Sequence, residues 1–517
     1  MRRVTSDSAL WLGLAAGLFT AAELTLAPLH APLGWDEITY IAQTSVHASP
    51  ILLPPGHSRG VGLLAAPVTL LTTSVVALRV WMAVLAGGGL FAALLAWRGL
   101  RPAWVLALAG LMFGGLAATQ FTGIQVEADL WEALGALAVA GLVLQAISRR
   151  RPARVTLPLI AAGVFFLILV RIEDAAFIVA PMIAAVTVVP AWRNRGALNA
   201  IGAGIVAGSA EWVGEAYAFY GGPGNRLRLA SLQPPRLGWH FSLLEQIRVL
   251  DGPAYCGPGA ACHDWYPWLG GWWLALLALA ILGIAVTAGA PSVLPGACAL
   301  FVLAGYTLFV PYAAGRYLLP VFALVAVPAA DGAARLITAE RRRPAAVLAV
   351  SAFLLTGLIS QHQVLTREFA GMTSGTQFYA TAAADLRQLG VRAPCAVDGG
   401  AAAPVAYYLG CSRGWHDVQR QVLLAPMRPR HPARWRRVRL AGTAQVAYIR
   451  PALRRPTSLA PPGPRGGRPS RLHPARLRPP ASLAPPGLRG GRPGRLHPAR
   501  LRPPVSLAPP GWRVGAA

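Results

Sequence analysis

The recurrence of long apolar runs over the first 360 positions constrains this chain more than any other feature. About twenty consecutive apolar residues form a helix that can cross the hydrocarbon core of a bilayer. Hydrophobic residues make up 55% of the 517 positions and charged residues 13%. The sequence therefore predicts an all-α polytopic membrane protein with about eleven transmembrane helices. The predicted spans are 8–29, 75–97, 103–122, 130–147, 155–171, 175–190, 197–218, 267–288, 296–314, 317–337 and 345–362.

Two apolar segments differ from the other predicted spans. Segment 61–73 is shorter than a span, so we expect it to enter the membrane without crossing it. Segment 8–29 follows only two arginines and carries no clear small-residue cleavage site. We interpret it as a retained first helix rather than as a signal peptide.

Clusters of arginine predict the orientation of the chain. They fall in every second loop, at Arg2–Arg3, Arg98 and Arg101, Arg149–Arg154, Arg193 and Arg195, and Arg341–Arg343. Positive charge near the ends of spans stays in the cytoplasm. We therefore expect a multi-pass protein of the cell membrane with a cytoplasmic N-terminus. Segments 30–74 and 219–266, and everything after residue 363, would then be extracytoplasmic.

The part of the chain after the last span divides into two regions. Residues 363–450 predict a small extracytoplasmic α/β domain appended to the transmembrane domain 1–362. Within it, a helix is expected from Phe378 to Leu389, followed by a strand, a turn and a second helix between residues 395 and 411. A domain this short cannot bury a large core.

Residues 451–517 are repetitive and basic. The sequence Ser-Leu-Ala-Pro-Pro-Gly begins at Ser458, Ser482 and Ser506. Proline and glycine at this density do not sustain helix or sheet, so we expect a disordered Pro/Arg-rich tail. The chain has 21 arginines and no acidic residue after Asp417, which accounts for most of its net charge of +27. Because this excess charge is predicted to lie outside the cell, no nucleic acid partner is expected.

Four cysteines fall in predicted extracytoplasmic regions. Cys256 and Cys262 lie in the loop 219–266, and Cys395 and Cys411 lie in the appended domain. In an oxidising compartment two such pairs favour disulfides. A zinc site made by the first pair with the adjacent histidine is the alternative, although the spacing matches no tight ligand motif.

The first predicted outer loop carries residues suited to chemistry. Asp36 and Glu37 follow the first span directly, and His57 and Arg59 come about twenty residues later. Carboxylates beside a histidine and an arginine at a membrane surface can form an acid–base and anion-binding pocket. A solvated loop is the alternative for this pair taken alone.

Further ionisable residues occur in the other predicted outer turns. Charged groups at membrane level are costly and are commonly functional, although each one alone can reach water by snorkelling. Their convergence on one side predicts a substrate-binding site. These residues are Glu127, Asp129, Arg171, Glu173, Arg316 and Tyr317.

The order and sidedness of these motifs resemble those of GT-C glycosyltransferases, the group that includes protein O-mannosyltransferases and lipid A aminoarabinose transferases. The resemblance covers residues 1–365 and an extracytoplasmic domain to residue 450. Arg171-Ile172-Glu173 is similar to an Arg-Pro-Glu found in the group but lacks its proline. The other matching features are Asp36-Glu37 after the first span, Ala77-Leu78-Arg79-Val80-Trp81, Glu127-Ala128-Asp129, and Arg316-Tyr317-Leu318-Leu319-Pro320.

This resemblance implies a GT-C-like fold and the transfer of a sugar from a polyprenyl-phosphate donor to an extracytoplasmic acceptor. The acceptor would be a cell-envelope glycan, a lipid or a protein. A single displacement would invert the anomeric centre. By position Asp36 is the general base, with Glu37 beside it. Arg59 and Arg316 would face the donor phosphate, and Glu127 and Asp129 would orient the substrate. Some members use a divalent metal, which Asp36 and Asp129 could hold.

A multi-pass secondary transporter is the alternative class. Transporters carry substrate sites near the bilayer midplane and commonly show repeated halves. Here Glu23, Glu211 and Glu215 are the acids expected deep in spans, and no half-repeat is visible. Glu211 and Glu215, four residues apart, would either pair with an arginine or line a cavity. A family member without activity is a third possibility.

Overall fold

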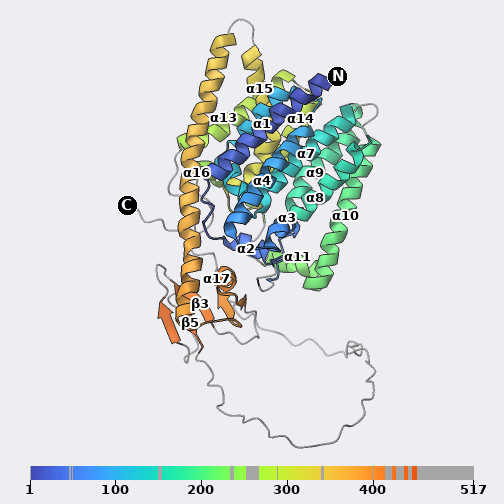
Figure 1. Cartoon of the computed structure of the whole chain (residues 1–517). Coiled ribbons are helices and arrows are strands. Elements are labelled where there is room, and N and C mark those ends of the chain that lie inside the picture. The colour runs from blue at the N-terminus through green and yellow to red at the C-terminus, as the bar shows by residue number, and fades with distance from the viewer. Residues whose placement is uncertain are drawn as a thin grey trace, which may run out of the picture. The chain divides into compact units, whose positions relative to one another are not determined.

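The computed structural model describes residues 2–45, 48, 51–148, 154–232, 238–251, 267–287, 289–338, 343–399, 401–413, 422–426, 436–439 and 445–450. These residues form a bundle of long helices followed by a small sheet (Figure 1). The predicted tail, 451–517, and the predicted Cys256–Cys262 pair lie outside the described residues.

Each predicted span falls on a helix or, in one case, on a bent pair of helices. Within the described residues, seven helices are long and apolar enough to cross a membrane, and the bent pair makes an eighth. The predicted polytopic membrane protein is therefore confirmed. The helices on these spans are α1 (Arg2–Leu26), α4 (Val75–Leu95), α5 (Ala103–Gly114) with α6 (Ala117–Gly123), α7 (Ala128–Ser148), α8 (Thr156–Val170), α9 (Ile172–Val188), α10 (Arg195–Tyr220), α13 (Pro267–Thr287), α14 (Ala290–Phe309), α15 (Leu319–Thr338) and α16 (Arg343–Gln388).

Short elements connect the long helices. The predicted short apolar segment 61–73 corresponds to α3 (Gly60–Thr69), which is 10 residues long and so too short to cross a bilayer. The other short elements are α2 (Trp35–Ile41), α11 (Pro223–Ser231), α12 (Leu243–Arg248) and the 3₁₀ turns η1 (Pro190–Trp192), η2 (Val249–Asp251) and η3 (Gly315–Leu318).

Helices α7 and α15 form the centre of the bundle. In their most apolar stretches 78% and 94% of the residues are buried, whereas in that of α16 only 17% are buried. Helix α15 lies close to α13 because glycine faces backbone at their crossing. A Cβ on Gly283 would sit 1.9 Å from the carbonyl oxygen of Pro328, and one on Gly332 would sit 2.3 Å from that of Leu279. This close contact requires residues without a side chain.

The predicted span 103–122 is not one continuous helix. It breaks between α5 and α6, which are bent by 80°. Two consecutive glycines, Gly114 and Gly115, weaken the helix there, and Leu116 adopts an extended backbone. The side chain of Gln361, from α16, accepts a hydrogen bond from the backbone N–H of Ala117 at 2.8 Å. The first turn of α6 is thereby capped by a distant helix.

The predicted last span, 345–362, and the predicted helix from Phe378 are parts of one helix. Helix α16 is 46 residues long and runs without interruption through position 363. No proline occurs between residues 345 and 393, so nothing in this stretch forces an end. The last helix of the bundle is therefore also the first helix of the appended domain (Figure 1).

The appended domain combines the end of α16 with α17 (Ala402–Leu409) and a five-stranded mixed sheet of order β2-β1-β3-β5-β4. Strand β1 pairs in parallel with β2 and β3, whereas β5 is antiparallel to β3 and β4. The sheet consists of β1 (Ala396–Gly399), β2 (Ser412–Arg413), β3 (Val422–Pro426), β4 (Arg436–Arg439) and β5 (Gln445–Ile449).

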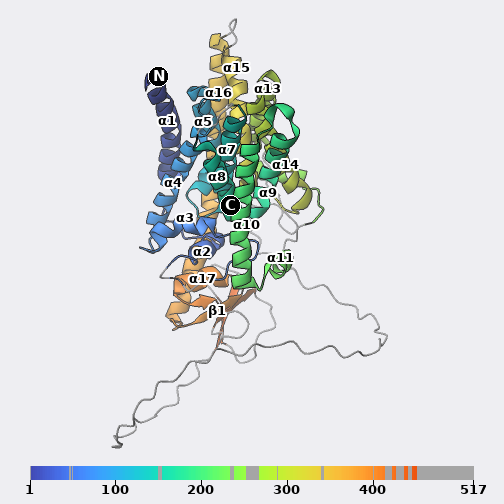
Figure 2. The same cartoon turned by 90° about the vertical axis from the view of Figure 1, so that its right-hand side faces the viewer.

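The two ends of the bundle differ. The N-terminal end of α1, the C-terminal end of α15 and the start of α16 lie at one end (Figures 1 and 2). Helices α2, α3 and α11 lie at the other end, with the appended domain. The connections that carry the candidate site residues are thus gathered at the end that bears the appended domain.

Candidate active site

The neighbouring carboxylates Asp36 and Glu37 occupy different environments in the first turn of α2. Glu37 accepts a hydrogen bond from the backbone N–H of Gly34 at 2.8 Å and so caps the helix. It also forms a two-pronged pair with Arg79 of α4, at 2.6 and 3.0 Å, and both side chains are at most 2% exposed. Asp36 is 29% exposed. Only Asp36 is therefore accessible to a substrate.

Arg316, in η3, lies among three carboxylates. Its guanidinium is 3.2 Å from Asp36 and 3.5 Å from both Glu127 and Asp129. Glu127 and Asp129 are 7% and 0% exposed, whereas Arg316 is 28% exposed. Arg316 thus joins a buried acidic group to the accessible Asp36.

A second arginine, Arg171, lies deeper in the same group, between α8 and α9. It is 2.8 Å from Asp129, 3.3 Å from Asp174 and 3.7 Å from Glu132. Its guanidinium also lies 3.3 Å from the hydroxyl of Tyr306, which donates to Asp174. Asp129 is shared by the two arginines, so the whole set forms one ion-pair network. We call it the carboxylate–arginine cluster: Asp36, Glu127, Asp129, Glu132, Arg171, Asp174 and Arg316.

The cluster contains more carboxylates than arginines. Five carboxylates face two arginines in a largely buried site. Burial raises the pKa of Glu127 well above its ordinary value, and the positive charge of Arg316 opposes the shift. Glu127 therefore holds its proton more tightly than an exposed glutamate, which reduces the excess of negative charge.

Aromatic rings and a histidine border the cluster. The ring of Tyr317 stacks on Tyr306 with centroids 5.3 Å apart, and the guanidinium groups of Arg171 and Arg316 lie 5.6 and 5.5 Å from its centre. His57 packs against Tyr40 with ring centroids 5.6 Å apart. Burial lowers the pKa of His57, whereas the carboxylate of Asp36 raises it, so the imidazole favours its neutral form.

Two of the residues expected at the site have other surroundings. Arg59 pairs with Glu215 of α10 at 2.6 Å, and Glu215 is also 3.0 Å from the buried Arg226. Glu215 is thus shared by two arginines, and among the described residues no salt bridge joins Arg59 to the cluster. Glu173 is exposed, and its neighbour Asp174 binds Arg171 instead.

Sequence reasoning did not single out Asp174, Glu132 and Tyr306 as site residues. Asp174 directly follows the expected Glu173, and Glu132 lies three residues after the expected Asp129. These two residues differ from the expected site residues in the face of the helix on which their side chains lie. Tyr306 had no sequence signal, because an aromatic residue in an apolar span is ordinarily a packing residue.

The expected metal pair has an arginine between its members. Arg316 reaches Asp36 with one nitrogen and Asp129 with another. Among the described residues, no group of three or more His, Cys, Asp or Glu side chains is arranged to hold a metal ion. The residues described here therefore do not fit a divalent metal at that position.

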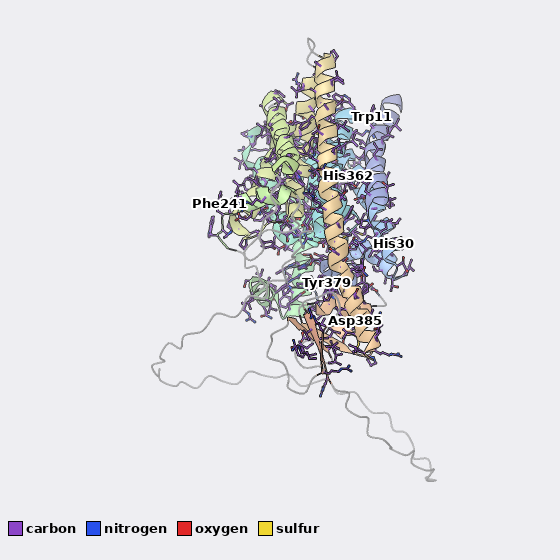
Figure 3. All side chains as sticks on the ribbon, turned by 90° about the vertical axis from the view of Figure 1, so that its left-hand side faces the viewer. Trp11, His30, Phe241, His362, Tyr379 and Asp385 are labelled. Atoms are coloured by element: carbon purple, nitrogen blue, oxygen red, sulfur yellow. A yellow bond between two sulfur atoms is a disulfide. The ribbon has the colours of Figure 1, made fainter. Side chains whose placement is uncertain are left out.

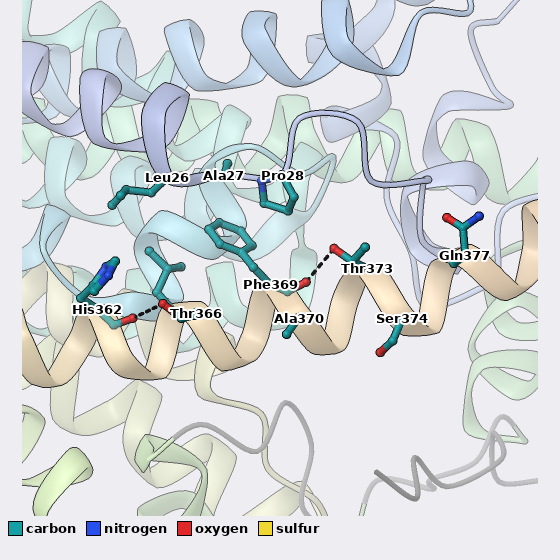
Figure 4. A pocket seen from close by; sticks show the side chains of 11 residues that line it. Leu26, Ala27, Pro28, His362, Thr366, Phe369, Ala370, Thr373, Ser374 and Gln377 are labelled. Atoms are coloured by element: carbon teal, nitrogen blue, oxygen red, sulfur yellow. Dashed lines mark hydrogen bonds between the residues drawn. The ribbon is translucent and has the colours of Figure 1, made fainter. Parts of the chain in front are cut away.

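An apolar groove opens between the end of α1 and the middle of α16 (Figure 4). Its volume is about 550 Å³. Tyr379 lies farther along α16 than His362 (Figure 3) and within electrostatic range of Asp36. Glu368, within the stretch of α16 that lines the groove, lies within electrostatic range of Arg316. Helix α16 therefore connects the groove with the cluster. The groove is lined by Leu26, Ala27, Pro28, His362, Leu365, Thr366, Phe369, Ala370, Thr373, Ser374 and Gln377.

Comparison with known proteins identifies the fold. No family model and no curated protein matches the sequence. The crystal structure of ArnT from Cupriavidus metallidurans bound to undecaprenyl phosphate matches with a TM-score of 0.55 at 13% identity, covering 78% of this chain and 85% of that one. The apo state of the same protein matches with a TM-score of 0.53 at 11% identity, covering 79% and 85%. The GT-C-like fold expected from the sequence is thus confirmed.

Proposed function

We propose that this chain is a membrane glycosyltransferase that moves a sugar from a polyprenyl-phosphate-linked donor to an acceptor outside the cytoplasm. The fold it shares with ArnT, a protein crystallised with undecaprenyl phosphate, supports a lipid-phosphate ligand. The proposal rests chiefly on the contact between Asp36 and Arg316. This carboxylate and this guanidinium are both partly exposed, and they lie at one edge of a buried ion-pair network.

The accessibility of the side chains supports a distinct role for each. Among the carboxylates of the cluster that pair with Arg316, Glu127 and Asp129 are nearly buried and Asp36 is 29% exposed. An accessible carboxylate can take a proton from an acceptor hydroxyl. An accessible guanidinium can bind phosphate oxygens in a two-pronged geometry. Asp36 would therefore be the base and Arg316 the phosphate ligand.

The proposed step is one displacement at the anomeric carbon. The acceptor oxygen forms a bond to that carbon while the bond from the carbon to the donor phosphate oxygen breaks. The acceptor proton moves to Asp36, and the electron pair of the broken bond leaves with the polyprenyl phosphate. Arg316 stabilises the negative charge that develops on the leaving phosphate. The products are the glycosylated acceptor and a free polyprenyl phosphate.

The buried part of the cluster would act by positioning. Asp129 holds Arg316 and Arg171 together, and Tyr306 holds Asp174. These contacts fix Arg316 before the substrate arrives, which reduces the reorganisation needed in the transition state. Glu37 is not among the groups proposed to contact substrate, since it is buried and paired with Arg79. Arg59 is a weaker candidate than Arg316, since it pairs with Glu215 and, among the described residues, forms no salt bridge with the cluster.

The groove beside α16 suits the apolar chain of the donor. The lining residues Leu26, Leu365 and Phe369 are apolar, and polar groups such as Gln377 stand toward the C-terminal end of the lined stretch of α16 (Figure 4). A prenyl chain lying there would gain from burial of its apolar surface. The orientation predicted from the arginine clusters places this end of the bundle outside the cytoplasm, where the acceptor would be met.

The surroundings of Glu215 and Glu23, two of the acids expected deep in spans, do not favour the alternative that the chain is a transporter. Glu215 is paired with Arg59 and Arg226 rather than facing an open cavity. Glu23 is 1% exposed and packs against Gly123. In the part of the chain that the structure describes, Glu23 forms no salt bridge, and Glu215 pairs with arginines rather than with a second acid that could relay an ion.

The proposal is tested with purified full-length protein in liposomes. The donors are a panel of undecaprenyl-phosphate-linked pentoses and hexoses, and total envelope lipid and glycan serve as acceptor. Transfer of label together with release of undecaprenyl phosphate supports the proposal. Movement of an unmodified solute across the liposome membrane, with no release of undecaprenyl phosphate from any donor, contradicts it.

A further inference from the structure

The appended domain touches the polypeptide segment that leads directly into Asp36. The backbone N–H of Leu33 donates to the hydroxyl oxygen of Tyr408, in α17, at 2.7 Å. Leu33 is 1% exposed, so this N–H has no access to bulk water. The bond spans 375 residues of sequence and lies three residues before Asp36. It is therefore a long-range contact at the start of the helix that carries the proposed base.

The next backbone N–H is held from the opposite side. Gly34 donates to Glu37, and Glu37 is locked to Arg79 of α4. Two successive N–H groups before α2 are thus bound by side chains of different origin, one from the bundle and one from the appended domain. A helix of seven residues has little stability of its own. The position of Asp36 accordingly depends on both contacts.

Tyr408 is itself fixed within the appended domain. Arg387, in the last turn of α16, donates to the carbonyl oxygen of Tyr408. The side chain packs against both the hydrophobic core of the bundle and that of the appended domain. Burial raises the pKa of the Tyr408 hydroxyl, so the group keeps its proton and can accept from Leu33 without introducing a charge.

A disulfide closes the unit that carries Tyr408. Cys395, directly before β1, is bonded to Cys411, directly before β2, with Cα atoms 4.8 Å apart. The backbone N–H of Ser412 donates to the carbonyl oxygen of Cys395 at 2.8 Å, which holds the same two ends together. The disulfide therefore restrains both ends of the β1–α17 segment.

Tyr379 brings a second part of the appended domain close to the same carboxylate. It lies on α16 beyond the groove and within electrostatic range of Asp36 (Figure 3). Asp36 is thus approached by α16 and supported by α17 through Leu33. The appended domain is therefore linked to the region of Asp36 in two places, through Tyr379 and through the hydrogen bond between Tyr408 and Leu33.

We propose that Tyr408 is a positioning residue for the transfer reaction: through its hydrogen bond to Leu33, and with α17 held by the Cys395–Cys411 disulfide, it sets the position of Asp36. This inference rests on the proposed function for its catalytic meaning. Its structural part concerns only Tyr408, Leu33 and α2, and can be measured without any substrate.

The substrate-free test is hydrogen exchange of full-length protein in nanodiscs. Tyr408→Phe keeps the ring and removes the hydroxyl. We expect exchange at Leu33 and the first turn of α2 to accelerate about tenfold, the factor that corresponds to one hydrogen bond of ordinary strength. Tyr407→Phe removes the neighbouring hydroxyl and serves as the matched control, with exchange of α2 unchanged. Equal exchange of α2 in wild type and Tyr408→Phe would overturn the proposal.

The catalytic test separates positioning from binding. With a donor from the panel that wild type uses, Tyr408→Phe should lower kcat about tenfold, while the Kd for undecaprenyl phosphate stays within twofold. Cys395→Ser/Cys411→Ser should lower kcat in the same direction. Because both changes act through α17, adding Tyr408→Phe to the double serine variant should cost less than it does alone.

The outcomes are distinct. Full additivity of the two effects, or a loss of undecaprenyl phosphate binding equal to the loss of kcat, would show that Tyr408 does not act through α2 and would overturn the proposal. If wild type transfers no sugar from any donor, the proposed function fails, while the exchange experiment still decides the contact between Tyr408 and α2.

Discussion

Arg316 contacts Asp36 through a guanidinium nitrogen that lies 3.2 Å from a carboxylate oxygen, and the two side chains are 28% and 29% exposed. The residues are 280 positions apart in sequence. Asp36 comes from the first short helix after α1, and Arg316 from the turn before α15. The fold thus brings a carboxylate from near the start of the chain and a guanidinium from far along it together at the end of the bundle that carries the appended domain.

Replacement of Arg316 by alanine should weaken donor binding. The phosphate would lose its counter-charge, and a charged hydrogen bond contributes enough that we expect at least about a tenfold rise in Kd for undecaprenyl phosphate. Equilibrium binding to protein in nanodiscs measures this. Arg335→Ala, in the last turn of α15 at the other end of the bundle, is the control. An unchanged Kd for Arg316→Ala would remove this residue from the phosphate site.

Replacement of Glu37 by glutamine should act mainly on stability. It leaves the buried Arg79 without a charged partner, which typically costs about 3–5 kcal/mol. Thermal unfolding in detergent should therefore show a clear fall in Tm, and the activity per folded molecule should fall far less than in Asp36→Asn. If Tm is unchanged while turnover is abolished, Glu37 contacts the reacting groups and its assigned structural role is wrong.

Glu127 predicts a pH dependence of stability. Its pKa is raised in the folded chain, chiefly by burial. A raised folded pKa contributes stability below the unfolded pKa, and this contribution is lost as pH rises through the folded value. Glu127→Gln removes the effect, so its Tm should rise relative to wild type between pH 5 and pH 8. A difference in Tm that is constant over this range would contradict the shift.

The orientation predicts which positions are labelled from outside the cell. Trp239 is 82% exposed, and Arg392 is also exposed. Single cysteines at these two positions should react with a membrane-impermeant maleimide on intact cells. A cysteine at Arg195, in a loop predicted to be cytoplasmic, should react only after permeabilisation. Protection of both 239 and 392 would reverse the predicted sidedness.

Sequence patterns were sufficient to predict the membrane-spanning helices and to place five site residues at the same end of the bundle. Apolar runs fix the length and place of spans because bilayer thickness leaves few alternatives. The alternation of sides then placed Asp36, Glu127, Asp129, Arg171 and Arg316 at one end, where the structure has them in one ion-pair network. Their roles in catalysis remain proposals.

Tertiary contacts supplied what the patterns did not contain. Asp36 and Glu37 are adjacent in sequence, but successive residues of a helix point about 100° apart, so one faces Arg316 and the other faces Arg79. For the same reason Asp174, and not the expected Glu173, faces Arg171. The ion pair between Arg59 and Glu215 joins residues 156 positions apart and has no local signal.

The most direct test of the account is the turnover of Asp36→Asn. The amide keeps the size of the side chain and removes the charge, so folding and undecaprenyl phosphate binding should stay close to those of wild type. Removal of a general base costs about 10²-fold or more in rate, and we expect a loss of that size in sugar transfer from the donor that wild type uses. Asp385→Asn, on the part of α16 in the appended domain, is the matched control and should turn over like wild type. If Asp36→Asn transfers sugar at the wild-type rate, Asp36 is not the base and the central claim is contradicted.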